Sequence, residues 1–372
     1  AWINKHNKSF GYFIDGHWQH PEGRQCTESK RPSTGEVLAQ TLDANPEDIN
    51  AAVASSQKAF DTWSNLSSHA RARHLYSIAR NLQKHQSLLA VVESLNCGKP
   101  TRETRNVDVP SAIRQFYHHA GWAEILNVEM RDWKPRGVTL IATDWTFPLM
   151  QLASFVGPAL ATGNTVVVIP SALTQLSTLL FAEVCAQAGL PPGVLNVLTG
   201  TSLDLLTSHT GVDKLVFFGS VADGQSLRQK TAGRGTSLSL SLLGRNPTLV
   251  FEEADLDSAV EGVIEAAFFN SGQSCHAGSR LLIQESVYLP LIKKLKGRMS
   301  KLTVGDNMDK NNDQGAQANP QMIERLSLLV SQAEAQGAEI FRSSTAACNK
   351  PQYFPPTLIE SIQVSSPVYL DE

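Results

Sequence analysis

Val138-Thr139-Leu140-Ile141-Ala142 is an apolar stretch rich in β-branched residues, and it begins a regular alternation of strand and helix patterns. A short apolar run of this kind predicts a buried strand. The patterns that follow it in order are a helix at 147–161, a strand at 165–169, a helix at 174–188, and strands at 194–198 and 214–218. Strands that alternate with helices are typical of a doubly wound parallel sheet. We therefore predict an α/β fold in which this sheet is the central element.

Gly219-Ser220-Val221-Ala222-Asp223-Gly224 follows the last of these strands and opens another helix. A glycine-serine turn at that place presents backbone N–H groups to which a pyrophosphate can bind. The turn differs from the Gly-x-Gly-x-x-Gly fingerprint, and many α/β proteins carry Gly-Ser after a strand. Taken alone, it is weak evidence for a nucleotide site.

The residues before the sheet give local signals of their own. The segment 11–18 alternates and turns at Asp15-Gly16, which predicts a β-hairpin. A second turn at 32–35 leads into a strand. Asn45 precedes Pro46 and two acids, which is the pattern of a capped helix start, and helical spacing continues to residue 95.

Phe268-Phe269-Asn270-Ser271-Gly272-Gln273-Ser274-Cys275-His276-Ala277-Gly278-Ser279-Arg280 holds one thiol between two glycines, after an apolar helical run. A reactive cysteine needs access and a backbone that substrate can approach closely, and glycine provides both. A lone cysteine is more often an inert core residue. The residues around Cys275 therefore have to decide whether it is a reactive thiol or an inert core residue.

Composition limits the possible partners. The chain has 372 residues, 42% hydrophobic and 18% charged, with a formal net charge of -3. This length suffices for two domains, and the charge argues against nucleic acid as a partner. We identify no membrane span or signal peptide, and we expect both ends to be cuts through a longer protein. His118 and His119 lack a third ligand at suitable spacing, so no metal site is predicted.

The cysteines indicate the compartment. They are odd in number and scattered, without a paired motif: Cys26, Cys97, Cys185, Cys275 and Cys348. This pattern predicts a reducing, cytoplasmic environment.

The Cys275 string resembles the active-site segment of the aldehyde dehydrogenase superfamily. Three further phrases of that superfamily occur in the expected order, namely Ile14-Asp15-Gly16-His17-Trp18, Pro32-Ser33-Thr34-Gly35-Glu36 and Glu93-Ser94-Leu95-Asn96-Cys97-Gly98-Lys99-Pro100. The resemblance runs from about residue 10 to the C-terminus. Segments 254–262 and 280–287 look most like the first domain of aldehyde dehydrogenase family 16, in which a second dehydrogenase-like domain follows.

The resemblance implies a domain layout. A Rossmann-type dinucleotide-binding domain spans 1–124 and 139–242, a shortened oligomerisation hairpin spans 125–138, and an α/β catalytic domain, incomplete at its C-terminus, spans 243–372. The implied cofactor is NAD or NADP, with contacts expected from Trp145, Gly200, Gly219, Ser220 and Gly224. The implied partners are a small-molecule aldehyde, a second copy in a homodimer, and the second domain of the longer protein.

The resemblance also assigns chemistry. Cys275 stands at the position of the nucleophile that attacks the aldehyde carbonyl. Thr146 stands where the superfamily has an asparagine that holds the oxyanion, and Ser241 stands where it has the glutamate that activates water. We expect the His276 side chain to point away from Cys275, which favours a structural role for this histidine.

Cofactor contacts are also altered. Ile169 and Ala172 replace the lysine and acid of the superfamily's Val-Lys-Pro-x-Glu phrase, and Leu243 replaces a glycine near the nicotinamide. The sequence thus leaves three hypotheses open. They are weak NAD(P)-dependent aldehyde oxidation through Cys275, a catalytically inactive scaffold or assembly domain, and acyl transfer to coenzyme A, which dispenses with the glutamate.

Overall fold

The computed structural model describes residues 1–200, 207, 209–343 and 350–370, and Cys348 lies outside them. The chain forms two compact units. Unit 1 comprises residues 1–31, 36–96 and 104–242, and unit 2 comprises residues 32–35, 97–103 and 243–372.

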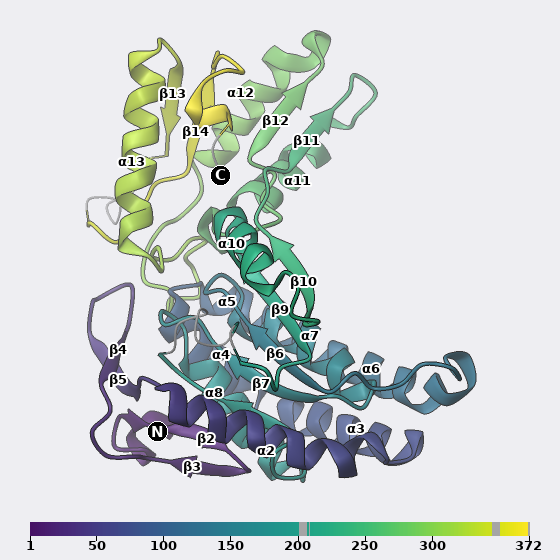
Figure 1. Ribbon diagram of the computed structural model, residues 1–372. Helices are drawn as coiled ribbons and strands as arrows, with labels where there is room; N and C mark the ends of the chain where they lie inside the picture. Colours follow the sequence, from purple (N-terminus) through teal and green to yellow (C-terminus); the bar gives the residue numbers. More distant parts are fainter. Residues whose placement is uncertain (201–206, 208, 344–349, 371–372) are drawn as a thin grey trace. The chain divides into compact units, whose positions relative to one another are not determined.

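The elements of unit 1 (Figure 1) are its helices α1 (Trp2–Lys5), α2 (Pro46–Ser64), α3 (Ser68–Lys84), α4 (Gln86–Cys97), α6 (Val109–Glu129), α7 (Pro148–Ala161), α8 (Leu176–Gln187) and α10 (Val221–Thr231). Its strands are β1 (Ser9–Phe10), β2 (Tyr12–Ile14), β3 (His17–Gln19), β4 (Cys26–Lys30), β5 (Val37–Leu42), β6 (Val138–Ala142), β7 (Thr165–Ile169), β8 (Leu195–Val197), β9 (Lys214–Gly219) and β10 (Ser237–Leu242). A π-helical turn at Thr104–Asp108 precedes α6.

The elements of unit 2 are its helices α5 (Thr101–Glu103), α11 (Leu256–Phe268), α12 (Tyr288–Met299), α13 (Pro320–Ala335) and α14 (Pro367–Leu370). Its strands are β11 (Pro247–Val250), β12 (Arg280–Ile283), β13 (Glu339–Arg342) and β14 (Thr357–Glu360). Short 3₁₀ turns occur at Phe269–Gly272 and Glu285–Val287.

The predicted parallel sheet is the centre of unit 1 (Figure 1). Seven strands lie in the order β10-β9-β6-β7-β8-β2-β3, and the first five are parallel. Predicted strands 138–142 and 165–169 have the bounds of β6 and β7, and the two later ones differ from β8 and β9 by a residue at their ends. The order reverses between β6 and β9, which makes that place the topological switch point.

Both faces of the sheet are covered, which explains why its strands are apolar throughout. Val166 and Val168 of β7 pack into a core with residues of α3, α6, α7 and α8. Val167 and Ile169 point to the opposite face and pack with residues of α2 and α10. Alternate residues of a strand face opposite sides, so a strand between two helical layers has no polar face.

The local signals near the N-terminus are confirmed. Asp15 and Gly16 have φ values of 54° and 77° in the turn between β2 and β3. The Asn45 side chain accepts from the Asp48 N–H at 3.1 Å, and the Asp48 carboxylate accepts from the Asn45 N–H at 3.0 Å. These two reciprocal bonds form a capping box at the start of α2.

Residues 125–138 form no hairpin, and that prediction is wrong. Helix α6 continues to Glu129, where the Met130 N–H donates to the Leu126 carbonyl at 2.8 Å, and the next strand begins at Val138. The physical reason is local, because the first proline or glycine after Gly121 is Pro135 and nothing earlier interrupts helical propensity.

Unit 2 is built around a smaller core. Strands β11 and β12 are parallel, β13 and β14 are antiparallel, and apolar residues of α11 and α12 pack with them. Among the residues described, none of the helices in either unit combines the length and apolarity needed to cross a bilayer.

Candidate active site

The loop that carries Cys275 begins with an unusual backbone. Where α11 ends, Asn270, Ser271 and Gly272 have φ values of 53°, 56° and 75°, so three consecutive residues are left-handed. A side chain with a Cβ costs about 1–2 kcal/mol in that region, and asparagine tolerates it best. Such a turn persists only where the surrounding structure holds it.

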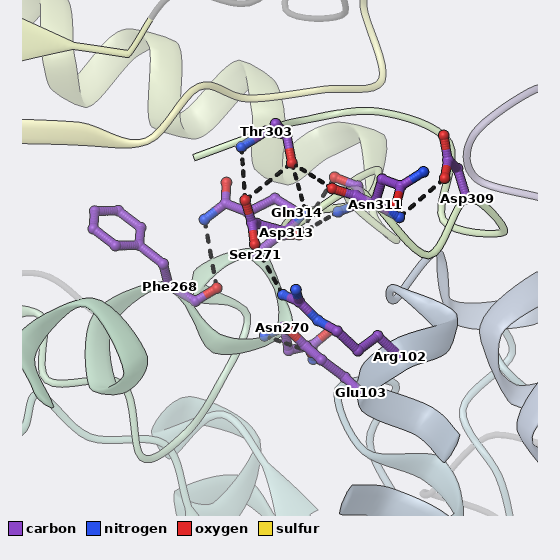
Figure 2. A network of polar contacts seen from close by, with 11 residues as sticks. Arg102, Glu103, Phe268, Asn270, Ser271, Thr303, Asp309, Asn311, Asp313 and Gln314 are labelled. Carbon is purple, nitrogen blue, oxygen red and sulfur yellow. Dashed lines mark hydrogen bonds and ion pairs between the residues drawn. The ribbon is translucent and has the colours of Figure 1, made fainter. Parts of the chain in front are cut away.

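Polar contacts from distant parts of unit 2 hold this turn (Figure 2). The Glu103 carboxylate accepts from the Asn270 N–H at 3.0 Å. The Asn270 amide donates to the Gln273 carbonyl at 2.8 Å. The Ser271 hydroxyl accepts from the Gly315 N–H at 3.0 Å. Because Asn270 is only 2% exposed, these bonds are shielded from water and define the entry to the thiol loop.

A second layer fixes the segment that reaches the turn (Figure 2). Arg102 pairs with Asp313 at 3.0 Å, and Thr303 donates to the same carboxylate through its N–H and its hydroxyl, both at 2.9 Å. Burial alone would raise the pKa of Asp313, but the bonds from Thr303 and the charge of Arg102 hold it below its ordinary value. Gln314 then donates to the Phe268 carbonyl at 3.4 Å.

Cys275 itself is half-buried and lies against its neighbour. The distance from its Sγ to Nδ1 of His276 is 3.1 Å. The Asn246 amide donates to the Cys275 carbonyl at 2.7 Å, and the His276 N–H donates to the Ser274 hydroxyl at 3.1 Å. The expectation that His276 points elsewhere is therefore wrong, because both residues lie in a turn and not in an extended strand.

Thr146 lies in the loop after β6 and is 4% exposed. Its hydroxyl donates to the Asp144 carboxylate at 3.2 Å and accepts from the Gln151 amide at 3.0 Å. Asp144 also accepts from the Thr146 N–H at 3.0 Å. Burial raises the pKa of Asp144 to about 6, although the bonds from residues 145 and 146 oppose the rise. While Asp144 is charged, the single hydroxyl hydrogen of Thr146 is directed to it.

Ser241 is the next-to-last residue of β10 and pairs in register with Phe218 of β9. Leu240 and Leu242 on either side pack into the core. Alternation places Ser241 on the other face. A serine hydroxyl does not titrate near neutral pH, so this position offers no base.

Four of the predicted cofactor positions follow strands at the switch point. Trp145 comes after β6, Gly219 ends β9, and Ser220 caps α10 by accepting from the Asp223 N–H at 3.1 Å. Parallel strands bring these ends to one edge of the sheet, where dinucleotides bind in such folds. A Cβ on Gly224 would lie 2.6 Å from Leu242, so the glycine lets α10 lie close to β10. These four positions stay predicted cofactor contacts.

Packing within the protein explains the residues at two other positions that the resemblance links to the cofactor, Gly200 and Ile169. Gly200 follows β8 with φ 65°, and a Cβ there would lie 1.8 Å from the Asp43 carboxylate, so packing against Asp43 requires the glycine. Ile169 is 5% exposed at the end of β7 and belongs to the core. It therefore offers no polar group to a nucleotide.

The comparisons with known proteins decide the family. The model of the aldehyde dehydrogenase family matches residues 18–372. The chain belongs to this family. The narrower resemblance to family 16 stays a prediction.

Solved structures resemble this chain closely, and two of the three described here are aldehyde dehydrogenases by their descriptions. A candidate aldehyde dehydrogenase from Burkholderia cenocepacia is 32% identical with a TM-score of 0.92, over 98% of this chain and 78% of its own. An NAD-dependent aldehyde dehydrogenase from Sinorhizobium meliloti is 30% identical with a TM-score of 0.92, over 97% and 75%. An NADP-dependent enzyme from E. coli is 29% identical with a TM-score of 0.92, over 98% and 79%. The predicted α/β aldehyde dehydrogenase fold is confirmed.

Sequence reasoning missed several residues that hold the Cys275 loop of unit 2 and the Thr146 loop of unit 1. Glu103 and Asn246 hold the thiol loop from other segments, and no local motif identifies them. Asp144 and Gln151 were within reach, because both flank Thr146 within one loop and helix start. Among the described residues, no group of three or more His, Cys, Asp or Glu side chains could hold a metal ion.

Proposed function

We propose that this chain oxidises small-molecule aldehydes to carboxylic acids through Cys275. Residues 1–124 and 139–242 would bind NAD or NADP, and residues 243–372 would carry the thiol chemistry. The single observation that carries the proposal is the left-handed turn at 270–272, which several segments hold and which precedes a half-buried thiol with an imidazole at 3.1 Å. Strained backbone of this kind is concentrated at functional sites.

The chemistry of the chain's own residues follows from the contacts. The Cys275 sulfur adds to the aldehyde carbon, and the carbonyl oxygen becomes an oxyanion that needs hydrogen-bond donors. A bound nicotinamide dinucleotide supplies the hydride acceptor. The thioester left on Cys275 is then hydrolysed by water, which needs a base.

Two substitutions limit the rate. The Thr146 hydroxyl donates to Asp144 and is not offered to an oxyanion while that carboxylate is charged. The loss of one such donor typically costs about 10²–10³ in rate. Ser241 supplies no base, and the loss of a base costs about 10²–10⁴ where no other group takes its place. We therefore expect slow turnover.

The test is NAD(P)H formation by the purified chain over a panel of aldehydes. Wild type should form NAD(P)H and acid, and Cys275→Ala should abolish both. Cys26→Ala is the matched control, because Cys26 is exposed on β4 in unit 1, and this variant should keep the wild-type rate. Equal rates in wild type and Cys275→Ala would refute the proposal.

A non-catalytic scaffold is the second candidate. The observation in its favour is that Ile169 is buried in the core and Thr146 is bonded to Asp144, so neither presents the polar group that the family uses there. Calorimetry distinguishes the two. Micromolar binding of NAD or NADP supports the enzyme, and absence of binding supports the scaffold.

A further inference from the structure

The contact between Cys275 and His276 is specific to the conformation of this turn. Sγ lies 3.1 Å from Nδ1 and 3.7 Å from Nε2. Neighbouring side chains of an extended strand point to opposite faces and do not meet. Here the turn brings a thiol and an imidazole within hydrogen-bond distance, which is the arrangement that activates a cysteine nucleophile.

The backbone on both sides of the pair is restrained, so the contact does not depend on two loose side chains. Asn246 binds the Cys275 carbonyl, and the Ser274 hydroxyl accepts from the His276 N–H. The Ala277 N–H donates to the Ser274 carbonyl at 3.1 Å, and the Gly278 N–H donates to the Ala266 carbonyl at 3.1 Å. These bonds close the turn and attach it to α11.

We propose that His276 is the general base of the thiol site and takes the role that Ser241 cannot fill. In the first step the thiol proton passes from Sγ to Nδ1, and the resulting thiolate forms a C–S bond with the aldehyde carbon as the carbonyl electron pair moves to oxygen. His276 is exposed, so its imidazolium returns that proton to solvent.

The second step is hydrolysis of the thioester that the proposed oxidation leaves on Cys275. Water attacks the acyl carbon and gives a proton to Nδ1, the C–S bond breaks, and Cys275 leaves as the thiolate while the carboxylic acid departs. The imidazolium then faces the thiolate, which restores the charged pair of the first step. This catalytic part rests on the proposed function, whereas the activation of the thiol does not.

The first experiment measures alkylation of the full chain by iodoacetamide as a function of pH, without aldehyde or cofactor. Mass spectrometry follows the Cys275 peptide, and exposed Cys26 serves as the internal reference. In His276→Gln, which keeps a polar side chain but accepts no proton, the rate at Cys275 should fall about fivefold at about pH 6.5 and converge with wild type within about twofold at about pH 9.5. His17→Gln, an exposed histidine of unit 1, should leave the profile unchanged.

The proposal would be overturned if the ratio of the alkylation rate at Cys275 to that at Cys26 were the same in wild type and in His276→Gln at every pH. His276→Ala provides a second variant, because added imidazole should restore the alkylation rate at Cys275 if the ring acts as a base. If imidazole leaves that rate unchanged, a purely structural role follows and the proposal fails.

The outcomes separate the two proposals. In one outcome, the pH profile of Cys275 alkylation depends on His276 but the chain forms no NAD(P)H from any aldehyde. This result refutes the proposed oxidation and leaves the thiol–imidazole pair intact. NAD(P)H formation whose pH dependence is unchanged in His276→Gln refutes the pair and leaves the oxidation intact.

Discussion

Asp144 links a buried charge to the hydrogen-bond capacity of Thr146. Asp144 is 8% exposed, and its carboxylate accepts from both the N–H and the hydroxyl of Thr146. When the Asp144 carboxylate is charged, it accepts a hydrogen bond from the Thr146 hydroxyl. When the carboxyl group is protonated, it can itself donate a hydrogen bond, and the Thr146 hydroxyl no longer needs to point toward it. A single titration therefore changes which hydrogen-bond donors this loop presents.

Stability should follow the same titration. Burial raises the pKa of Asp144 from 3.8 to about 6 in the folded chain. The folded state thus binds this proton more tightly than the unfolded state, so this group's contribution to the free energy of unfolding increases as pH falls from above 6 to about 4, by about 3 kcal/mol in full. Asp144→Asn should be about 1–3 kcal/mol more stable than wild type at about pH 8. The difference should shrink below about pH 5.

Urea unfolding at several pH values measures this difference. Asp223→Asn, in which an exposed acid of the same unit is changed, is the control and should show no comparable dependence on pH. A constant difference between Asp144→Asn and wild type across the range would contradict the assignment.

Helix α10 and strand β10 show how a glycine sets the distance between two elements. Gly224 lies in the first turns of α10, and a Cβ there would come within 2.6 Å of the Leu242 side chain. The Leu242 side chain, which is partly buried and packs against the core that contains Leu227, would have to shift to make room. The close approach keeps the start of α10 next to the end of β9, where the cofactor is proposed to bind.

Two helical glycines make a matched pair for a test. Gly224→Ala should lower the free energy of unfolding by about 1 kcal/mol, because overpacking outweighs the gain in helix propensity. Gly262→Ala in α11 meets open space and should raise that free energy by about 0.5–1 kcal/mol. Thermal unfolding followed by circular dichroism measures both variants. Equal changes of the same sign in the free energy of unfolding would show that contact with Leu242 does not disfavour a Cβ at position 224.

Elements with a local cause could be predicted from the sequence, and elements with a distant cause could not. The apolar run at 138–142 needs only its own residues to form a buried strand, and Asn45 caps α2 through a residue three positions away. The hairpin expected at 125–138 rests on a family pattern, whereas residues 122–134 hold no proline or glycine and helix α6 continues to Glu129. The support of the thiol loop comes from Glu103, which lies 167 residues from Asn270, and periodicity cannot reveal such a pair.

At the scale of the whole molecule, the chain has the fold of an aldehyde dehydrogenase and belongs to that family. Its central element is a doubly wound sheet with a topological switch point. Thr146, Ser241 and Ile169 stand where the resemblance predicts an oxyanion donor, a base and a cofactor contact. On the proposal that Cys275 is the nucleophile, His276 offers a proton acceptor beside it, so these three positions would reduce the oxyanion donors and the cofactor contacts more than the supply of a base.

The most direct test of aldehyde oxidation at Cys275 is detection of its covalent intermediate. The full chain is mixed with an aldehyde and NAD or NADP, quenched in acid, and measured by mass spectrometry of the Cys275 peptide. We predict an acyl thioester on Cys275 that requires the nucleotide. At about pH 9.5, where the thiolate forms without His276, the thioester should accumulate further in His276→Gln because its hydrolysis is slower. Unmodified Cys275 in every mixture, with an aldehyde panel that includes aliphatic and aromatic members, would contradict the account.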